Sequence, residues 1–412
     1  MLQGSLKKDM LETFNVYSDS IQSWEAAGFM VTGGDNLLET NAYFRYNPKV
    51  EDQTMSLYSK TLKAPIASKP TIVKNHYNGE NEILVQDENN VLHLLTADGK
   101  QLFSLDLGEK IISEIYQVDR YKNKKLQYLF NTKSSLYLVD RNGEFVEDFP
   151  ITLSSKASNG LRVFDYDNSR KYRIFLANEK NEILCFDIRG KEVKGWNKFK
   201  SSGAVKNEIS HLSIDGKDYL VTCNELGQII ILNRRGETRI KISEELPAGR
   251  DYYLNKTEDI NTCSFICTDS IGSIYSISFA DIKDVTPIKA FSDQHKFYLA
   301  DVNQDGYNDY VFVDEGTVSV FKLTKSSLFE FENGDIGHFS SIDILNNGSL
   351  IIGITDESNE KTYLINDKGE IIEGFPVEGI SPMNVFDLNG DGKYELIIGD
   401  KEGNIYFYSF NN

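Results

Sequence analysis

The sequence is poor in several residues that mark common protein classes. Its 412 residues include 4 cysteines, 5 histidines, 8 prolines and 2 tryptophans. The cysteines form no Cys-x-x-Cys pair, and Cys263 and Cys267 would lie roughly 13 Å apart on a strand, too far for a disulfide. The histidines show no spacing typical of zinc ligands. We therefore expect buried free thiols and neither a disulfide framework nor a zinc site.

Positive charge is also scarce, and long apolar runs are missing. Lys and Arg number 44 against 62 Asp and Glu, a formal net charge of −18. Such a surface repels phosphate backbones and anionic lipids, so we expect no nucleic-acid partner. No run of 18 apolar residues occurs, so we expect no transmembrane segment in this chain. No signal sequence is recognisable at its start, which is compatible with a longer precursor.

What the chain does contain is a repeated phrase: an apolar strand, a polar turn ending in glycine, and a second strand. The turn glycines stand at positions 99, 143, 190, 236 and 369, which are 44, 47, 46 and 133 residues apart. The last spacing is close to three periods, which predicts two more repeats with diverged turns near Asp281 and Thr324. Each unit of about 45 residues carries four strand signals, as a blade of a β-propeller does. Tyrosine and phenylalanine, 22 and 24 residues, also favour strands.

The predicted fold is therefore all-β: an eight-bladed β-propeller of four-stranded antiparallel blades over residues 55–412. The last repeat has only three strands, whereas "MSLYSKT" at position 55 has no partners of its own. Pairing this strand with the C-terminal "NIYFYSF" would close the ring and remove an exposed edge. Seven blades are the alternative, because the fifth and sixth repeats are weak. Residues 1–54 do not fit the period and are predicted to be a short β-rich segment, either packed on the propeller or a remnant of an upstream domain.

Two acidic loops share the pattern D-x-N-x-D-G-x-x-[DE]: "DVNQDGYND" at 301–309 and "DLNGDGKYE" at 387–395. EF-hands are excluded because the twelfth positions are Phe312 and Ile398 instead of glutamate, and because the flanks read as strands. The loops are predicted to join the first and second strands of blades six and eight.

Oxygen-bearing residues at alternate positions suit calcium, which takes six to eight oxygen ligands. The predicted ligands are Asp301, Asn303, Asp305, the Tyr307 carbonyl and Asp309 in one site, and Asp387, Asn389, Asp391, the Lys393 carbonyl and Glu395 in the other. The alternative is a plain acidic turn, because Asp, Asn and Gly are good turn formers. The equivalent loops of blades three ("DYDNSRKYR") and seven ("SIDILNNGS") lack the full set, so the fold tolerates its loss. We expect two structural calcium ions and no other cofactor.

These features resemble two propeller groups. The acidic loops, followed by "YVFV" and "LIIG", resemble the FG-GAP/VCBS repeats of integrin-α-like propellers, and this resemblance implies calcium in the loops. The phrase "LYLVDRNG" together with eight blades is similar to the quinoprotein-like propellers of the BamB type. The repeated tryptophans with which quinoprotein enzymes dock their blades are absent, since the chain has only Trp24 and Trp196.

The resemblance implies a non-catalytic, calcium-stabilised scaffold for protein–protein contacts in a Gram-negative cell envelope, in the periplasm or at the surface. The expected partner is an outer-membrane β-barrel or an assembly or secretion complex. Calcium affinity of the extracellular class, about 10⁻⁴–10⁻³ M, also favours an extracytoplasmic setting. We expect no enzyme, because no nucleophile elbow, Ser-x-x-Lys box or metal–histidine cluster occurs. A carbohydrate-binding or adhesion module is the alternative, and a polysaccharide-processing enzyme is a further one.

Overall fold

The computed structural model describes residues 24–34, 37–46, 56–332, 341–346 and 350–411. Contacts divide the chain into two units, Met1–Met55 and Ser56–Asn412. In the first unit, β1 (Trp24–Gly34) and β2 (Leu37–Tyr46) pair antiparallel, in register from Ala26–Arg45 to Gly34–Leu37. The predicted strands "GFMVTGG" and "NAYFRY" are this pair, whereas the predicted strand "ETFNVYSD" lies outside the described residues.

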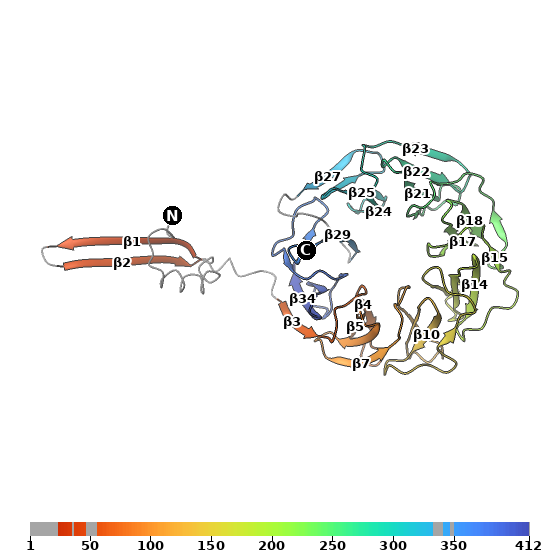
Figure 1. Cartoon of the computed structure of the whole chain (residues 1–412), viewed down its shortest axis with the longest axis horizontal. Helices are drawn as coiled ribbons and strands as arrows, with labels where there is room; N and C mark the ends of the chain where they lie inside the picture. The colour runs from red at the N-terminus through yellow and green to blue at the C-terminus, as the bar shows by residue number, and fades with distance from the viewer. Residues whose placement is uncertain (1–23, 35–36, 47–55, 333–340, 347–349, 412) are drawn as a thin grey trace. The chain divides into compact units, whose positions relative to one another are not determined.

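The second unit is a ring of eight antiparallel four-stranded sheets (Figure 1). The structure confirms the predicted all-β fold, with eight blades and not seven. No helix long and apolar enough to cross a membrane occurs among the described residues. The strands of blades one to four are β4 (Thr71–Lys74), β5 (Asn81–Gln86), β6 (Val91–Thr96), β7 (Gln101–Asp106); β8 (Tyr116–Val118), β9 (Gln127–Asn131), β10 (Ser135–Val139), β11 (Ile151–Thr152); β12 (Arg162–Phe164), β13 (Arg173–Ala177), β14 (Glu182–Asp187), β15 (Phe199–Lys200); β16 (Ser210–Ile214), β17 (Lys217–Cys223), β18 (Ile229–Leu232) and β19 (Thr238–Ile240).

The strands of blades five to eight follow the same order along the chain. They are β20 (Tyr253–Asn255), β21 (Ser264–Thr268), β22 (Ile274–Ser278), β23 (Lys283–Thr286); β24 (Lys296–Ala300), β25 (Asp309–Asp314), β26 (Thr317–Phe321), β27 (Ser327–Glu332); β28 (Ser341–Asn346), β29 (Leu350–Asp356), β30 (Lys361–Ile365), β31 (Val377–Glu378); and β32 (Asn384–Phe386), β33 (Tyr394–Gly399) and β34 (Asn404–Phe410). The fourth strand of blade eight is β3 (Ser56–Thr61), from the other end of the chain.

This closure is the one that the sequence predicts. Strand β3 pairs antiparallel with β34, with Ser59 opposite Tyr406 and Thr61 opposite Asn404. The pairing continues beyond the strand, because the Leu62 amide donates a hydrogen bond of 2.8 Å to the Gly403 carbonyl. Both ends of the propeller thus meet in one blade, which leaves no blade with an unpaired third strand.

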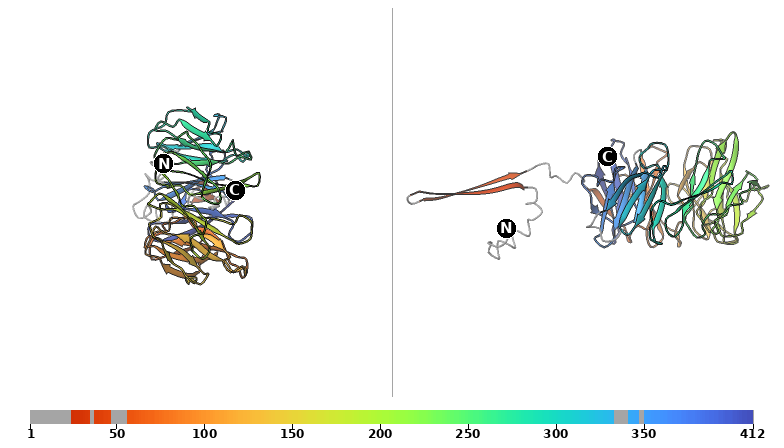
Figure 2. Two further views of the ribbon diagram at one scale, coloured as in Figure 1. Left: turned by 90° about the vertical axis from the view of Figure 1, so that its right-hand side faces the viewer. Right: turned by 90° about the horizontal axis from the view of Figure 1, so that it is seen from above.

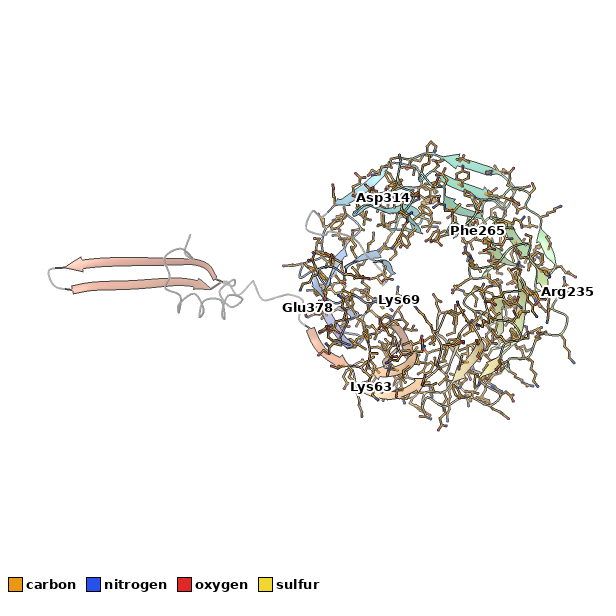
Figure 3. The ribbon with its side chains drawn as sticks, in the orientation of Figure 1. Lys63, Lys69, Arg235, Phe265, Asp314 and Glu378 are labelled. Atoms are coloured by element: carbon orange, nitrogen blue, oxygen red, sulfur yellow. The ribbon has the colours of Figure 1, made fainter. Side chains whose placement is uncertain are left out.

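The core lies between the blades and not within one sheet. Eight clusters of buried apolar side chains each join two neighbouring blades, and the cluster of Ile83, Leu388 and Phe407 joins blade eight to blade one. Second strands such as β5, β9 and β21 are buried along their whole length, because both faces of each sheet contact a neighbour. Figure 3 shows these side chains filling the spaces between blades, with Phe265 among them. Aliphatic and phenylalanine side chains thus do the docking that repeated tryptophans do in quinoprotein enzymes.

The outermost strands differ in length between blades. Strands β11, β15 and β31 each contain two residues, and of "VKGWNKF", the fourth strand signal of the third repeat, only Phe199 lies in β15. Figure 1 shows β4 and β24 near the centre of the ring and β7, β23 and β27 at its rim. A strand at the rim has one neighbour instead of two, so fewer hydrogen bonds and contacts hold it in register.

The turns between strands define two faces of the ring, which Figure 2 shows edge on. Successive turns of an antiparallel sheet alternate between its two edges. Among the described residues, the first–second turns and the third–fourth turns therefore share one face, here named the top face. The described second–third turns and connections between blades form the bottom face.

The third–fourth turns contain the predicted glycines. Gly99, Gly143, Gly190, Gly236 and Gly369 have φ between 72° and 84°. At Gly236 a Cβ would lie 2.2 Å from the Asn197 carbonyl oxygen, so space as well as φ requires glycine. In the diverged fifth and sixth repeats Asp281 and Lys325 adopt positive φ instead, at and next to the predicted turn positions. All four cysteines are free and buried, as predicted.

Candidate metal loops of blades six and eight

The two acidic loops lie where the sequence places them. One joins β24 to β25 and the other joins β32 to β33, so both are first–second turns on the top face. Their ninth residues, Asp309 and Glu395, already belong to β25 and β33. Each loop is therefore fixed at both ends by the blade.

In blade six the loop is closed by hydrogen bonds from its own backbone. The Asp301 carboxylate accepts the N–H groups of Asp305 and Gly306 at 3.0 and 2.9 Å. The Asn303 amide donates to the Asp305 carboxylate at 3.0 Å. The Asp309 carboxylate accepts the Val302 N–H at 3.0 Å and so joins β25 to the start of the loop.

The loop of blade eight repeats this arrangement. Asp387 accepts the N–H groups of Gly390 and Gly392 at 2.7 and 3.0 Å. Asn389 donates to Asp391 at 3.0 Å. Glu395 Oε2 accepts the Leu388 N–H at 2.9 Å, as Asp309 accepts that of Val302.

The structure thus gathers the predicted ligands in each loop but directs most of their oxygens at N–H groups. Tyr307 and Lys393 donate their own N–H groups to Asp305 and Asp391 at 3.1 and 2.8 Å, and the role of their carbonyls as ligands stays a prediction. Among the described residues, no three His, Cys, Asp or Glu side chains converge as a metal-holding group. Calcium in these loops stays a prediction as well.

The ninth residue of each loop is a buried carboxylate without a positive partner. Asp309 and Glu395 are each 1% exposed. Neither forms an ion pair within the described part of the chain, and Glu395 Oε1 has no hydrogen-bond partner there. Burial raises the pKa of Asp309, and the nearby charges of Asp305 and Asp301 add to this rise in its pKa. Burial likewise raises the pKa of Glu395, together with the charges of Asp391 and Asp387.

Buried carboxylates near the start of the second strand in blades one and four are neutralised by arginine, Glu82 at the position equivalent to Asp309 and Asp218 one residue before it. Glu82 in β5 accepts hydrogen bonds from Arg141 Nε at 3.0 and 3.1 Å, and Arg141 comes from the next blade. Asp218 in β17 accepts from Arg234 Nε at 2.5 Å and lies 2.7 Å from His211 Nε2. Although burial opposes it, the hydrogen bonds from His211 and Arg234 lower the pKa of Asp218.

Blade two carries a neutral version of the same loop. Asp119 accepts the N–H groups of Asn123 and Lys124 at 3.0 and 2.9 Å, as Asp301 does in blade six. The ninth residue is Gln127, whose Oε1 accepts the Arg120 N–H at 2.9 Å. Blade three has the same turn, in which Asp165 accepts the N–H groups of Ser169 and Arg170 at 3.0 and 2.7 Å and the ninth residue is Arg173. The loop shape therefore depends on the aspartate at its start and needs no negative charge at its ninth position.

The arginine partners of Glu82 and Asp218 were not predicted from the sequence. Their signal is present in the third–fourth turns "DRNG" and "NRRG", which contain Arg141 and Arg234. The sequence does not show which turns lie beside which strands, so these pairings could not be predicted from it.

The donor types in the two loops suit a divalent cation, although the carboxylates do not converge on one point among the described residues. Each loop holds three carboxylates and an amide oxygen, the hard oxygen donors that calcium takes. One of these carboxylates is buried without a positive charge nearby, and leaving a buried charge uncompensated is costly. A bound calcium ion would supply the missing charge that Arg141 and Arg234 supply in blades one and four.

Comparisons with known proteins give the fold and no family. No protein-family model matches the chain, and no curated protein matches it in sequence. The crystal structure of BamB from Moraxella catarrhalis is similar, with a TM-score of 0.57 and 14% identity over 87% of this chain and 100% of that chain. This likeness supports the BamB-type propeller architecture, and the FG-GAP/VCBS resemblance rests on the two loops.

Two further similar structures have TM-scores below 0.5. The crystal structure of BBS1N in complex with ARL6DN has a TM-score of 0.49 and 11% identity over 87% of this chain and 97% of that chain. The Pan2 WD40 domain of Neurospora crassa has a TM-score of 0.47 and 12% identity over 88% of this chain and 97% of that chain.

Proposed function

We propose that the protein is a non-catalytic, calcium-stabilised propeller that serves as a scaffold for protein–protein contacts in a bacterial cell envelope. Its place is the periplasm or surface of a Gram-negative bacterium, and its partner is an outer-membrane β-barrel or an assembly or secretion complex. Similarity to the fold of BamB and the need of low-affinity calcium loops for millimolar calcium support this setting. A fold alone does not give a function, so the surface of the ring has to support the scaffold role.

The observation that carries the scaffold proposal is the distribution of exposed aromatic side chains. Within the described residues, Tyr77, Tyr121, Phe145 and Tyr307 are the large aromatics with exposures of 43% to 69%. All four lie in first–second or third–fourth turns, and therefore on the top face. Exposed aromatic side chains are typical of protein interfaces, where they provide large contact areas at low entropic cost.

Calcium has a structural role in this proposal. Each ion would neutralise the buried carboxylate of Asp309 or Glu395 and would hold the first turn of its blade against the second strand. At ~2 mM calcium and a Kd of ~0.1 mM, one site adds ~1.8 kcal/mol to the free energy of unfolding. Calcium thereby fixes the top face over blades six and eight.

The test is purification of the full-length protein from the cells that make it, in mild detergent, with calcium and with a chelator. The proposal predicts a stoichiometric membrane-protein partner, identified by mass spectrometry after reversible cross-linking. Recovery of the protein without a partner in both conditions would contradict the scaffold role. Loss of the partner on chelation would indicate that the two loops contact the partner or stabilise the surface that contacts it.

A glycan-binding module is a second candidate, favoured by one groove. The groove has a volume of about 940 Å³ on the top face of blades four to six, and its walls include Asn255, Asp305 and Tyr307. An exposed tyrosine beside amide and carboxylate groups suits stacking and hydrogen bonding with a sugar ring. A glycan array probed with wild type and with Tyr307→Ala tests this candidate. Binding that Tyr307→Ala abolishes would support it, and absence of binding would reject it.

A further inference from the structure

A positively charged groove of this acidic protein lies on the top face of blades two and three. It has a volume of about 760 Å³ between the two blades and is lined by seven basic and three acidic residues. Its walls are the first–second and third–fourth turns of both blades. A surplus of four positive charges here contrasts with the net charge of −18 of the whole chain.

Some of these basic groups have structural partners, and three have none. Arg120 donates to the Glu147 carbonyl at 2.6 Å, and Arg170 Nη1 lies 2.9 Å from Asp119. Lys171, Arg189 and Lys191 are exposed, and their side chains form no ion pair or hydrogen bond within the described residues. Three unpaired cations around one groove create a positive potential that attracts an anionic ligand.

An aromatic pocket adjoins this groove. It has a volume of about 420 Å³ between blades one and two, and it shares Tyr121 and Glu147 with the groove. Tyr77, Tyr121 and Phe145 line it with exposures of 69%, 51% and 43%. Arg141, which pairs with Glu82, also lies 5.9 Å from the Tyr77 ring centroid, which fixes one wall of the pocket. The pocket can receive one large apolar side chain next to the positive groove.

We propose that the groove of blades two and three and the adjoining aromatic pocket together bind an acidic peptide segment of a partner protein, with one aromatic or aliphatic residue of that segment in the pocket. This inference deepens the proposed scaffold function and rests on it. Nucleic acid is disfavoured as the ligand because the rest of the chain is strongly acidic and repels a long phosphate backbone. A short acidic segment contacts only the positive region and gains from both the charges and the rings.

The first test measures peptide binding to the full-length protein by fluorescence anisotropy. The probe is a fluorescein-labelled peptide of Asp and Glu residues around one central Phe, with a counterpart in which Ala replaces Phe. Reversal of two unpaired cations, Lys171→Glu with Arg189→Glu, is expected to weaken binding about tenfold. The matched control reverses Lys110 and Lys241, two exposed and unpaired lysines in bottom-face connections, and is expected to change binding less than about twofold.

The pocket is tested by combining protein and peptide changes. Phe145→Ala is expected to weaken binding of the Phe peptide about fivefold and to leave binding of the Ala peptide nearly unchanged. Equal weakening of both peptides would overturn the assignment of the pocket. Equal weakening by the top-face and bottom-face charge reversals would overturn the groove. A single-stranded oligonucleotide of equal charge that binds more tightly than the peptide would also overturn the proposal, in favour of a nucleic-acid surface.

A second test separates this surface from the scaffold function itself. Wild type and the Lys171→Glu/Arg189→Glu variant are purified from native cells after cross-linking, and their equal melting temperatures show equal folding. A partner present with wild type and lost with the variant supports the surface. A partner retained by the variant overturns the surface and leaves the scaffold proposal standing. Absence of any partner with wild type contradicts the scaffold proposal, on which the biological role of the surface depends.

Discussion

The first turns of blades two and eight have similar hydrogen bonds but differ in the charge of their ninth residue. In both, an initial aspartate accepts N–H groups of the turn, and the ninth side chain accepts the N–H of the second residue. Blade two uses the neutral Gln127 for the second task, whereas blade eight uses the buried carboxylate of Glu395. The shape of the turn therefore does not account for the charge. The carboxylates of Asp309 and Glu395 need another explanation, and a bound cation provides one.

In blades one and four, arginine neutralises the buried carboxylate. Glu82 pairs with Arg141, and Asp218 pairs with Arg234. Removing Arg141 should therefore have the largest effect, because it leaves Glu82 buried and unpaired. We expect Arg141→Met to lower the free energy of unfolding by about 3–5 kcal/mol, measured by urea denaturation. Adding Glu82→Gln should restore much of this loss, and failure of that rescue would show that Arg141 stabilises the fold by packing instead of by charge.

One substitution makes the first turn of blade eight resemble that of blade two. Glu395→Gln keeps an acceptor for the Leu388 N–H, as Gln127 does for Arg120, but removes the charge. We expect this variant to lose one site's share of calcium stabilisation, ~1.8 kcal/mol at ~2 mM calcium. In chelator it should be at least as stable as wild type, because no buried charge remains.

Gln127→Ala is the matched control in blade two. It removes a hydrogen-bond acceptor and should lower the free energy of unfolding by about 1 kcal/mol, equally with calcium and with chelator. Both variants are measured by thermal unfolding with calcium and with chelator. A calcium-dependent loss of stability in Gln127→Ala would show that the calcium effect is not specific to the acidic loops.

The pH dependence of stability should have opposite signs for the two kinds of carboxylate. Burial raises the folded-state pKa of Asp309 and Glu395, so the folded protein binds more protons than the unfolded chain. In chelator, their contribution to stability should fall as pH rises from about 4 through their raised pKa. The pKa of Asp218 is lowered, so its contribution should be present above about pH 4 and lost as pH falls through that lowered pKa. Stability is measured by urea denaturation at several pH values. Asp309→Asn/Glu395→Gln should abolish the fall in stability with rising pH, and Asp218→Asn should abolish the fall with decreasing pH.

The smallest expected effect concerns an exposed neighbour of the blade-six loop. Lys322 Nζ lies 3.5 Å from the Asp305 carboxylate and would compete with a cation for it. Lys322→Met should therefore tighten calcium binding by about threefold, with little change in stability. Isothermal titration calorimetry with Lys325→Met as the control measures this, and unchanged affinity would place the ion elsewhere than at Asp305.

Periodicity in the sequence was sufficient to predict the ring, its eight blades and its closure by β3 on β34. The repeated pattern of strand, turn glycine and strand depends on local structure and can therefore be recognised in the sequence. The last repeat lacks a fourth strand, and the strand at position 55 is the one left to complete it. The outer strand of the third repeat was predicted too long, because an apolar residue such as Trp196 can pack at the rim without forming a ladder.

The positions of the two acidic loops were predicted correctly, but contacts between blades were not predicted. Arg141 of blade two pairs with Glu82 of blade one, so no local sequence pattern indicates the pair. The groove of blades two and three depends on turns from residues 120 to 191 meeting on one face. Its basic loops are visible in the sequence as "DRYKNKK" and "SRKYR", but their convergence follows only from the order of the blades.

Calcium-dependent thermal unfolding of wild type and of Asp309→Asn/Glu395→Gln tests the central claim most directly. Each protein is heated in ~2 mM calcium, in chelator, and in magnesium as the control for ionic strength. For wild type, two sites predict ~3.6 kcal/mol, or a rise in melting temperature of about 5 °C with calcium over chelator. The double variant should show no rise. An equal rise in both proteins, or none in wild type, would contradict the account that these two buried carboxylates are held by calcium.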